Sequence, residues 1–550
     1  MRKLIALLSL IALVGCAQIP TGIDVRSGPE VASQNEQEFA YYTPSGPAPE
    51  ASQQQIVSGF LAAGTGPQND YSVAREFLSK DFAQRWKPDA AVLIRSGAPE
   101  FREVTGDAQI VSLNISARLD EHGRYTDPPS NQAISLRFQL IEEDGQWRIS
   151  SAPDLTVVTA PVFAVVFQPY NLYFYDSQQR RLVPDSRWFP SRASTGTRLV
   201  NALLDGPSGW MQQAVQSAIP AGTKLTIDAV RVESGVAQVD FDSNALSADA
   251  LGRRLMLSQL RATLSQLSGV NEVAIYVNSS PQDIVPAAVP AIQNGSEGLA
   301  LADGVIRISS GLQQPLPGTA SFVEAFSPSL FAVNSLTNQT AFASSAGIHL
   351  VSGSGFSARS ERISVATGIA ALDFDAEGLL WVIPRQSGAE IQIYAGAELV
   401  KTLVLPGLGE RVSAQLSPDG ARLGVLLRAQ DENRIDVFSV NRDVRDRPSM
   451  LYRGVTIENV LGSPLTFAWQ TGVTVRVIER TPTGTTALSE YPLAGPRVQL
   501  PIPPVSAAKI TSGSNSSTTY LLGENQEVWA LAGGSWRRTL TGVVDITSAG

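Results

Sequence analysis

The pattern of apolar and polar positions separates the chain into stretches with different periods, and the first is a short apolar run. This run, Leu4–Val14, follows the basic pair Arg2–Lys3 and ends at Gly15, directly before Cys16. A basic start, a short apolar run and small residues at its end are typical of a secretory signal peptide. A membrane-spanning helix needs about 20 apolar residues, so this run is too short to cross a bilayer. We therefore expect residues 1–15 to be an export signal.

The next stretch predicts a spacer followed by helices. Residues 16–50 are rich in Pro, Gly, Ser, Gln and Glu, which is typical of a flexible linker. Apolar residues then recur at helical spacing from Ile56. The same spacing returns after Asp70, which the pattern marks as the N-cap of a second helix that reaches Leu78.

From about residue 104 the apolar period changes from that of a helix to that of a strand. Two alternating runs are separated by Asp144-Gly145, a pair that favours a tight hairpin. The acidic residues Glu142–Asp144 then lie in a solvent-facing turn. Helices followed by antiparallel strands predict an α+β domain of the NTF2-like type over residues 51–155.

Residues 161–285 combine alternating strands with two helical stretches and predict a second, small α/β unit. A helix over TGTRLVNALLD ends at Gly206-Pro207, and a hairpin turns at Ser234-Gly235. Ser247 is expected to cap the second helix, whose first apolar residue is Leu251. The run VNEVAIYVN supplies the closing strand.

In residues 300–550 short apolar strands alternate with Gly, Ser, Asn and Pro turns. A strand, a tight turn and a second apolar strand recur at intervals of about 40–50 residues, which is the spacing of β-propeller blades. The aligned copies contain Phe326, Phe374, Leu416, Trp469 and Ile510. The segment is long enough for about five or six blades, and a β-sandwich is the alternative.

Composition and charge change the picture mainly by exclusion. The chain has 550 residues, of which 43% are hydrophobic and 17% charged, and its formal net charge is −9. An acidic chain without a basic block argues against nucleic acid as the main ligand. The two histidines, His122 and His349, are far apart, and Cys16 is the one cysteine. We therefore predict no metal site and no cofactor.

No set of residues assembles a nucleophile, a base and an oxyanion hole. Asp240 and Asp242 share one face of a strand just ahead of a helix, where acidic residues commonly serve as caps. Ser417 lies in the β-turn sequence SPDG, which differs from the nucleophile elbow of hydrolases. His122 lies in a polar loop and His349 in a predicted blade. We predict no catalytic residues and no enzyme activity.

Aromatic residues are dense around the first hairpin of the second unit. They are Tyr170, Tyr173, Phe174, Tyr175, Trp188 and Phe189. Strand alternation places about half of them in a core, and the others face a neighbouring domain or a partner. The cluster is therefore a candidate binding surface.

The residues around Cys16 predict what its thiol does. Leu-Val-Gly-Cys resembles the bacterial lipobox, in which the signal is cut before the cysteine and the thiol is diacylated. One acyl chain binds a membrane marginally and two bind it stably, so diacylglycerol and N-acyl lipid on Cys16 would anchor the protein. We predict lipidation of Cys16 and a location on the extracytoplasmic face of the cell membrane. A buried N-terminal helix with an incidental cysteine is the alternative.

The order of these parts resembles the actinobacterial LpqB lipoprotein family over essentially the whole chain. The second unit is similar to the GerMN domain, whose pattern is matched at Gly206-Pro207, Ile219–Thr223 and Val239–Phe241. The resemblance implies an accessory regulator that contacts the extracytoplasmic domain of an MtrB-like sensor histidine kinase and influences cell-envelope homeostasis and division. It supplies no catalytic residues to transfer.

Two other functions remain open at this point. The chain could be a peptidoglycan- or glycan-binding cell-wall lipoprotein that uses the propeller mouth and the aromatic cluster to hold sugars. A wall hydrolase is the third hypothesis, but the sequence shows no set of residues that would form its catalytic site.

Overall fold

We describe a computed structural model of the chain that covers residues 44–550 apart from short gaps. The gaps are residues 105, 128–131, 289–296, 310–311, 335, 408, 429–432, 458–462, 514–517 and 549–550. The predicted export signal, Cys16 and most of the predicted spacer lie outside the described residues. Residues 44–550 form one compact unit.

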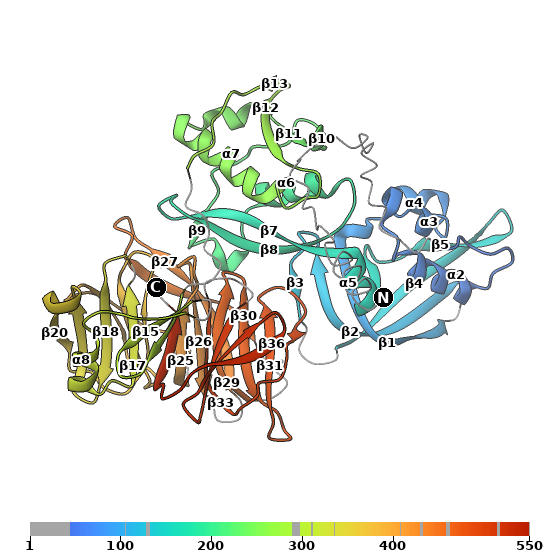
Figure 1. The fold of residues 1–550 in the computed structure, drawn as a ribbon. Coiled ribbons are helices and arrows are strands. Elements are labelled where there is room, and N and C mark those ends of the chain that lie inside the picture. The colour runs from blue at the N-terminus through green and yellow to red at the C-terminus, as the bar shows by residue number, and fades with distance from the viewer. Residues whose placement is uncertain are drawn as a thin grey trace, which may run out of the picture. The chain divides into compact units, whose positions relative to one another are not determined.

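The first domain has short helices packed on a mainly antiparallel sheet (Figure 1). Its helices are α2 (Gln53–Ala63), α3 (Ser72–Arg75) and α4 (Lys80–Arg85), and its strands are β1 (Ala91–Val104), β2 (Ala108–Asp120), β3 (Tyr125–Thr126), β4 (Gln132–Glu143), β5 (Gln146–Ser151) and β6 (Thr156–Thr159). The strand order is β5-β4-β2-β1-β6, and β6 runs parallel to β1. Ser52 and Gln55 form a capping box that begins α2, whose buried Ile56 and Phe60 join the core. The α+β class is confirmed.

The predicted second helix from Asp70 to Leu78 is present only as the short helix α3, and its predicted N-cap, Asp70, is wrong. Asn69, Asp70 and Tyr71 have φ angles of 47°, 56° and 58°, so the backbone is left-handed where the helix should begin. Only the four residues of α3 are helical. A separate helix, α4, begins after its N-cap Ser79, whose side chain accepts the Phe82 N–H.

The sheet also begins earlier than its alternating pattern indicated, at Ala91 instead of about residue 104. The first four residues of β1, Ala91–Ile94, are all buried, so they form a continuous apolar run without a strand period. The hairpin at Asp144-Gly145 is confirmed, with φ angles of 54° and 73° that suit a type I′ turn.

Helix α5 (Ala160–Val166) leads into the second domain, which contains two small sheets and two longer helices. Its remaining elements are β7 (Phe167–Asp176), β8 (Leu182–Pro190), α6 (Thr195–Asp205), β9 (Val215–Gln216), β10 (Arg231–Glu233), β11 (Val236–Phe241), α7 (Ala250–Leu264), β12 (Glu272–Val277) and β13 (Ser280–Pro281). The sheet orders are β8-β7-β9 and β10-β11-β12-β13, and α7 is the crossover between the parallel strands β11 and β12.

Two of the three predicted boundaries in this domain are confirmed. Helix α6 ends at Gly206, whose φ is 90°, and the hairpin β10–β11 turns at Ser234-Gly235. The predicted cap Ser247 is wrong because it lies in a short 3-10 turn. Asp249 begins α7 instead, and its carboxylate accepts the Gly252 N–H at 2.7 Å.

Within the described residues, six four-stranded antiparallel sheets form a β-propeller, which agrees with the predicted range of five or six blades. In chain order the later blades are β17–β20, β21–β24, β25–β28, β29–β32 and β33–β36, and the first blade combines β14–β16 with the C-terminal strand β37. The strands are β14 (Gly298–Leu301), β15 (Val305–Ser309), β16 (Leu312–Pro315), β17 (Leu330–Asn334), β18 (Gln339–Ser344), β19 (Gly347–Ser352), β20 (Arg359–Ser364), β21 (Ile369–Phe374), β22 (Leu380–Pro384), β23 (Ile391–Ala395), β24 (Glu398–Leu403), β25 (Glu410–Leu416), β26 (Arg422–Arg428), β27 (Asn433–Arg442), β28 (Pro448–Ile457), β29 (Ser463–Thr471), β30 (Thr474–Arg480), β31 (Thr486–Pro492), β32 (Val498–Gln499), β33 (Ala507–Ser512), β34 (Thr519–Gly523), β35 (Val528–Ala532), β36 (Ser535–Leu540) and β37 (Asp545–Ser548).

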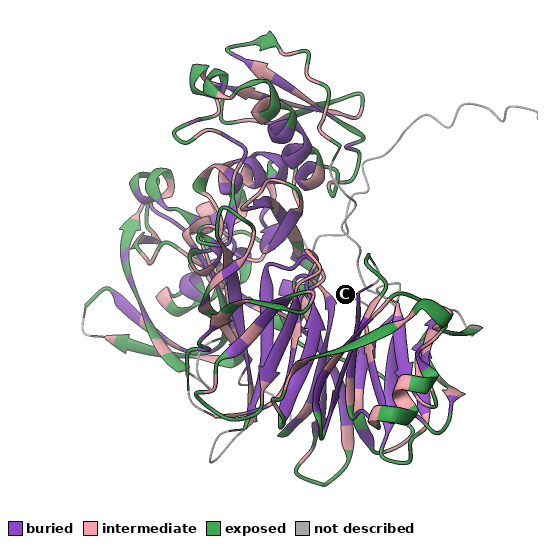
Figure 2. Cartoon of the chain, turned by 90° about the vertical axis from the view of Figure 1, so that its left-hand side faces the viewer, coloured by how far each residue is buried: buried purple, intermediate pink, exposed green. Residues whose placement is uncertain are grey.

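The inner strands β37, β17, β21, β25, β29 and β33 neighbour one another in a ring around the propeller axis. Pairing of β37 with β14 joins the end of the propeller to its beginning, so no blade edge stays open at the closure. Figure 2 shows that the propeller strands are mostly buried and that many of the loops between them are exposed.

One of the five residues aligned in the predicted repeat does not lie in an inner strand. Phe374, Leu416, Trp469 and Ile510 all lie in inner strands, as the repeat requires. Phe326 instead ends a helix, α8 (Ala320–Phe326), and the inner strand of that blade is β17. The linker before β17 is long enough to hold this helical turn, which shifts the apparent repeat.

Candidate functional site

The residues that the sequence singled out for chemistry do not meet in one place. Cys16 lies outside the described residues, so its lipidation stays a prediction. Asp242 caps a short 3-10 turn by accepting the Asn244 N–H at 3.2 Å, as predicted. Asp240 binds elsewhere, because its carboxylate accepts the Ser279 N–H at 3.0 Å. Both aspartates therefore accept hydrogen bonds from backbone N–H groups.

The two histidines lie in different domains. His122 Nδ1 is 3.1 Å from a carboxylate oxygen of Asp205, which joins a loop of the first domain to the end of α6. His349, in β19, stacks on Phe326 with ring centroids 4.0 Å apart. Burial and the charge of Arg362 lower the pKa of His349, so it is neutral at pH 7. Among the described residues no group of three or more His, Cys, Asp or Glu could hold a metal ion.

The aromatic cluster serves the interior and the domain junctions. Phe174 and Phe189 are buried in the core of the second domain. The ring centroids of Trp188 and Phe163 are 4.8 Å apart. The Trp188 indole N–H donates to the Ala494 carbonyl of the propeller at 2.7 Å. The rings of Phe174, Phe189 and Trp188 are therefore used within the chain, whereas Tyr170 and Tyr173 are only partly buried.

The junction of the first and second domains is built around Asp89. Its carboxylate binds the guanidinium groups of Arg192, at 2.6 Å, and Arg198, and it accepts the Tyr71 hydroxyl at 3.2 Å. Burial, and next the charge of Asp89, raise the pKa of Tyr71, so its hydroxyl keeps its proton. Two arginines on one carboxylate give this junction a charged, hydrogen-bonded centre.

The second domain contacts one side of the propeller through the turns between neighbouring strands. The turn after β21 presents Glu377, whose carboxylate binds Arg180 at 2.6 Å and also Arg181. Burial opposes ionisation of Glu377, but the hydrogen bonds from Arg181 and Arg180 outweigh it and lower its pKa. Arg180 also reaches Asp446 in the turn between β27 and β28.

The turn that contains Ser417 takes part in the same contact. Ser417 Oγ donates to Asp419 at 2.6 Å, and the Asp419 carboxylate binds Arg422 at 2.8 Å. Arg422 then donates to the Pro184 carbonyl and lies over the Trp210 ring, with its guanidinium carbon 5.7 Å from the ring centroid. Ser417 thus stabilises a turn, in agreement with the interpretation from sequence.

The opposite side of the propeller is where the inner strands begin. In a four-stranded antiparallel blade, the turns after the first and third strands lie at one end, and the linker to the next blade lies at the other. Four of the described linkers carry an aliphatic side chain that is between 53% and 75% exposed: Val365, Val404, Ile502 and Val544. We call these four residues the linker ring.

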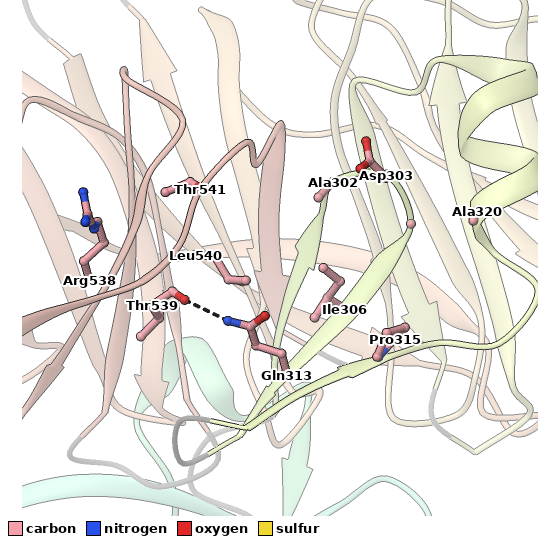
Figure 3. Close-up of a pocket in the computed structure, with 11 residues that line it drawn as sticks. Ala302, Asp303, Ile306, Gln313, Pro315, Ala320, Arg538, Thr539, Leu540 and Thr541 are labelled. Atoms are coloured by element: carbon pink, nitrogen blue, oxygen red, sulfur yellow. Dashed lines mark hydrogen bonds between the residues drawn. The ribbon is translucent and has the colours of Figure 1, made fainter.

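A cleft of about 550 Å³ lies between the first blade and the outer strand β36 (Figure 3). Ile306, Pro315 and Leu540 give it apolar walls, and Asp303 lies in the turn at its rim. Gln313 spans the two blades by donating to the Thr539 carbonyl at 2.9 Å. The cleft also includes Thr541, which belongs to the same linker as Val544.

Polar residues on the inner strands tie consecutive blades together around the channel. The Asp373 carboxylate accepts the Leu416 N–H at 2.8 Å, and Gln415 Oε1 accepts the Trp469 N–H at 3.0 Å. Two cavities of about 40 and 50 Å³ share Asp373 and Gln415 as lining residues. Burial raises the pKa of Asp373 to about 7, against the hydrogen bonds that lower it.

Three protein families match consecutive parts of the chain. "Lipoprotein LpqB, N-terminal domain" matches residues 46–164, "Sporulation and spore germination" matches 171–283, and "Lipoprotein LpqB beta-propeller domain" matches 303–547. Similar curated proteins include Lipoprotein LpqB of Bifidobacterium longum, 29% identical over 76% of this chain and 75% of that protein. Lipoprotein LpqB of Thermobifida fusca is 30% identical over 52% of this chain and 46% of that protein.

Among solved structures, the first GerMN domain of the sporulation protein GerM from Bacillus subtilis is similar, with 19% identity. It matches 22% of this chain and 94% of that structure, with a TM-score of 0.19. Within the part of the chain that the structure describes, no helix is both long and apolar enough to span a membrane.

Proposed function

Because the chain belongs to the LpqB lipoprotein family, we propose that it is an accessory regulator of a sensor histidine kinase. It is anchored on the extracytoplasmic face of the membrane by lipid on Cys16 and acts by contact with the extracytoplasmic domain of an MtrB-like kinase. It influences cell-envelope homeostasis and division through that contact and catalyses no reaction. The use of Ser417, Asp240 and Asp242 in turns and caps supports a role without catalysis.

The observation that carries the proposal is the linker ring, which lies on the side of the propeller opposite to the described contacts of the second domain. Val365, Val404, Ile502 and Val544 offer aliphatic surface from four linkers around one face. The cleft of Figure 3 is lined in part by Thr541, which belongs to the same linker as Val544, and it can take a projecting segment of the partner. Apolar groups at the centre of an interface with a polar rim are typical of protein–protein contacts.

The proposal is tested by measuring binding of the mature chain to the purified extracytoplasmic domain of the kinase. We expect the triple variant Val365→Ser/Val404→Ser/Ile502→Ser to weaken binding at least tenfold, since each buried aliphatic side chain contributes on the order of 1 kcal/mol. Val444→Ser is the control, because Val444 is also an exposed valine, at 92%, but lies in a turn on the side of the second domain. Absence of a complex at tens of micromolar, or equal weakening by the control, contradicts the proposal.

Two further measurements separate the alternatives. Co-sedimentation of the mature chain with peptidoglycan, at a level that the triple variant does not change, would favour the glycan-binding hypothesis. Replacement of Cys16 by alanine should release the protein from membranes or leave its precursor uncut. Continued membrane attachment of a processed Cys16→Ala protein would contradict the lipid anchor.

A further inference from the structure

The propeller channel contains a small buried cavity with polar walls. Its volume is about 40 Å³, and Asp373, Ser413, Lys509 and Thr511 are among the residues that line it. These residues come from three inner strands, β21, β25 and β33. Lys509 and Thr511 are two positions apart in β33, so both side chains leave the strand on the same side.

Several oxygen atoms around this cavity lack a partner within the chain. Thr511 is 1% exposed, and its hydroxyl oxygen makes no hydrogen bond. The hydroxyl of Ser413 is likewise buried without a partner. At Asp545, next to Lys509, one carboxylate oxygen is paired and the other is not. Buried polar groups are normally satisfied, so these atoms indicate an occupant of the cavity.

The charges around the cavity do not balance. Asp373 and Asp545 are both buried acids, and Lys509 Nζ lies 2.7 Å from Asp545. Asp375, which also faces Asp373, is neutralised by Arg442 at 2.9 Å. One ammonium therefore serves two carboxylates, and the charge of Asp373 has no counter-charge of its own. A buried charge without a partner is strongly unfavourable.

We propose that this cavity binds one alkali metal cation, of the size of Na⁺, between the Asp373 carboxylate and the hydroxyls of Thr511 and Ser413. All the available donors are oxygen atoms, which suit hard cations and disfavour metals that prefer nitrogen or sulfur. A divalent ion would add a second positive charge beside the Lys509 ammonium, whereas a monovalent ion balances the site. A volume of about 40 Å³ holds an ion and one or two waters, since a water needs about 10–15 Å³ of such space.

Bound sodium is expected to stabilise the folded propeller, because it would bind the folded chain and not the unfolded one. The cation would fix the inner strands of three blades at the axis.

The test measures the unfolding temperature of the mature full-length chain at pH 8 in NaCl and in choline chloride of equal ionic strength. We expect a Tm higher by a few degrees in NaCl. Thr511→Val keeps the volume and removes the unpartnered hydroxyl, so it should reduce the sodium response. Thr402→Val, in the outer strand β24, is the matched control and should keep it.

Asp373→Asn provides a second variant, since its amide oxygen can still accept the Leu416 N–H while the charge is lost. We expect this variant to show no specific response to sodium. Equal Tm values in NaCl and choline chloride for the unmodified chain, or a full sodium response in both variants, would overturn the proposal. A larger shift with CaCl₂ at matched ionic strength would overturn the assignment to a monovalent ion.

Discussion

Replacement of Arg422 by methionine tests how the propeller holds the second domain. Arg422 and Asp419 form a 2.8 Å ion pair whose side chains are 2% and 1% exposed. The same guanidinium donates to the Pro184 carbonyl of the second domain. Methionine keeps most of the side-chain volume but removes the charge and all the donors, so Asp419 stays buried without its counter-charge.

The expected loss is about 3–5 kcal/mol of propeller stability, which is the usual effect of removing one partner of a buried pair. Asp419 keeps hydrogen bonds from Ser417 and the Ala421 N–H, so the loss should lie near the lower end of that range. In the double variant Arg422→Met/Asp419→Asn, no charge stays buried. We therefore expect the double variant to be about 1–3 kcal/mol more stable than the sum of the two single changes predicts.

Calorimetry of the full mature chain, which separates the transitions of a multidomain protein, is the assay for these variants. Arg428→Met is the matched control on the same strand, since Arg428 is more than half exposed and pairs with Glu410 at the surface. Its effect should stay below about 1 kcal/mol. If Arg422→Met costs no more than this control, or if the double cycle is additive, the argument from burial is refuted.

Two further predictions concern the channel and the junction of the domains. In sodium-free buffer, the folded state holds the proton of Asp373 up to a pKa of about 7, whereas an unfolded aspartate loses it near 3.9; the unfolding free energy should therefore fall by roughly 3–4 kcal/mol as pH rises from 4 to 8. Asp373→Asn should remove this fall, and parallel pH profiles of the two proteins would contradict the prediction. Trp188→Phe removes the hydrogen bond to the Ala494 carbonyl, so the second domain should be cleaved faster from the propeller in limited proteolysis, while its own transition shifts by less than about 2 kcal/mol; unchanged cleavage would show that this contact does not hold the domains together.

Local patterns predicted a large part of the fold. The Asp144-Gly145 and Ser234-Gly235 hairpins and the end of α6 at Gly206 follow from backbone conformations that these residues adopt readily. The propeller was predicted because each blade repeats the same short strands and turns, and four of the five aligned residues lie in inner strands. Asp70 failed as a helix cap because three consecutive left-handed residues there depend on packing, which a propensity does not contain.

The sequence by itself determined the family, the classes of the domains and the cysteine predicted to carry lipid, because each of these is written in contiguous residues. Only the tertiary structure decided how Arg422, Asp419 and Pro184 meet, and which side of the propeller the linker ring occupies. The uncompensated charge of Asp373 was likewise invisible in the sequence. Its surroundings come from strands on several blades, and burial is a property of the assembled ring that no single strand encodes.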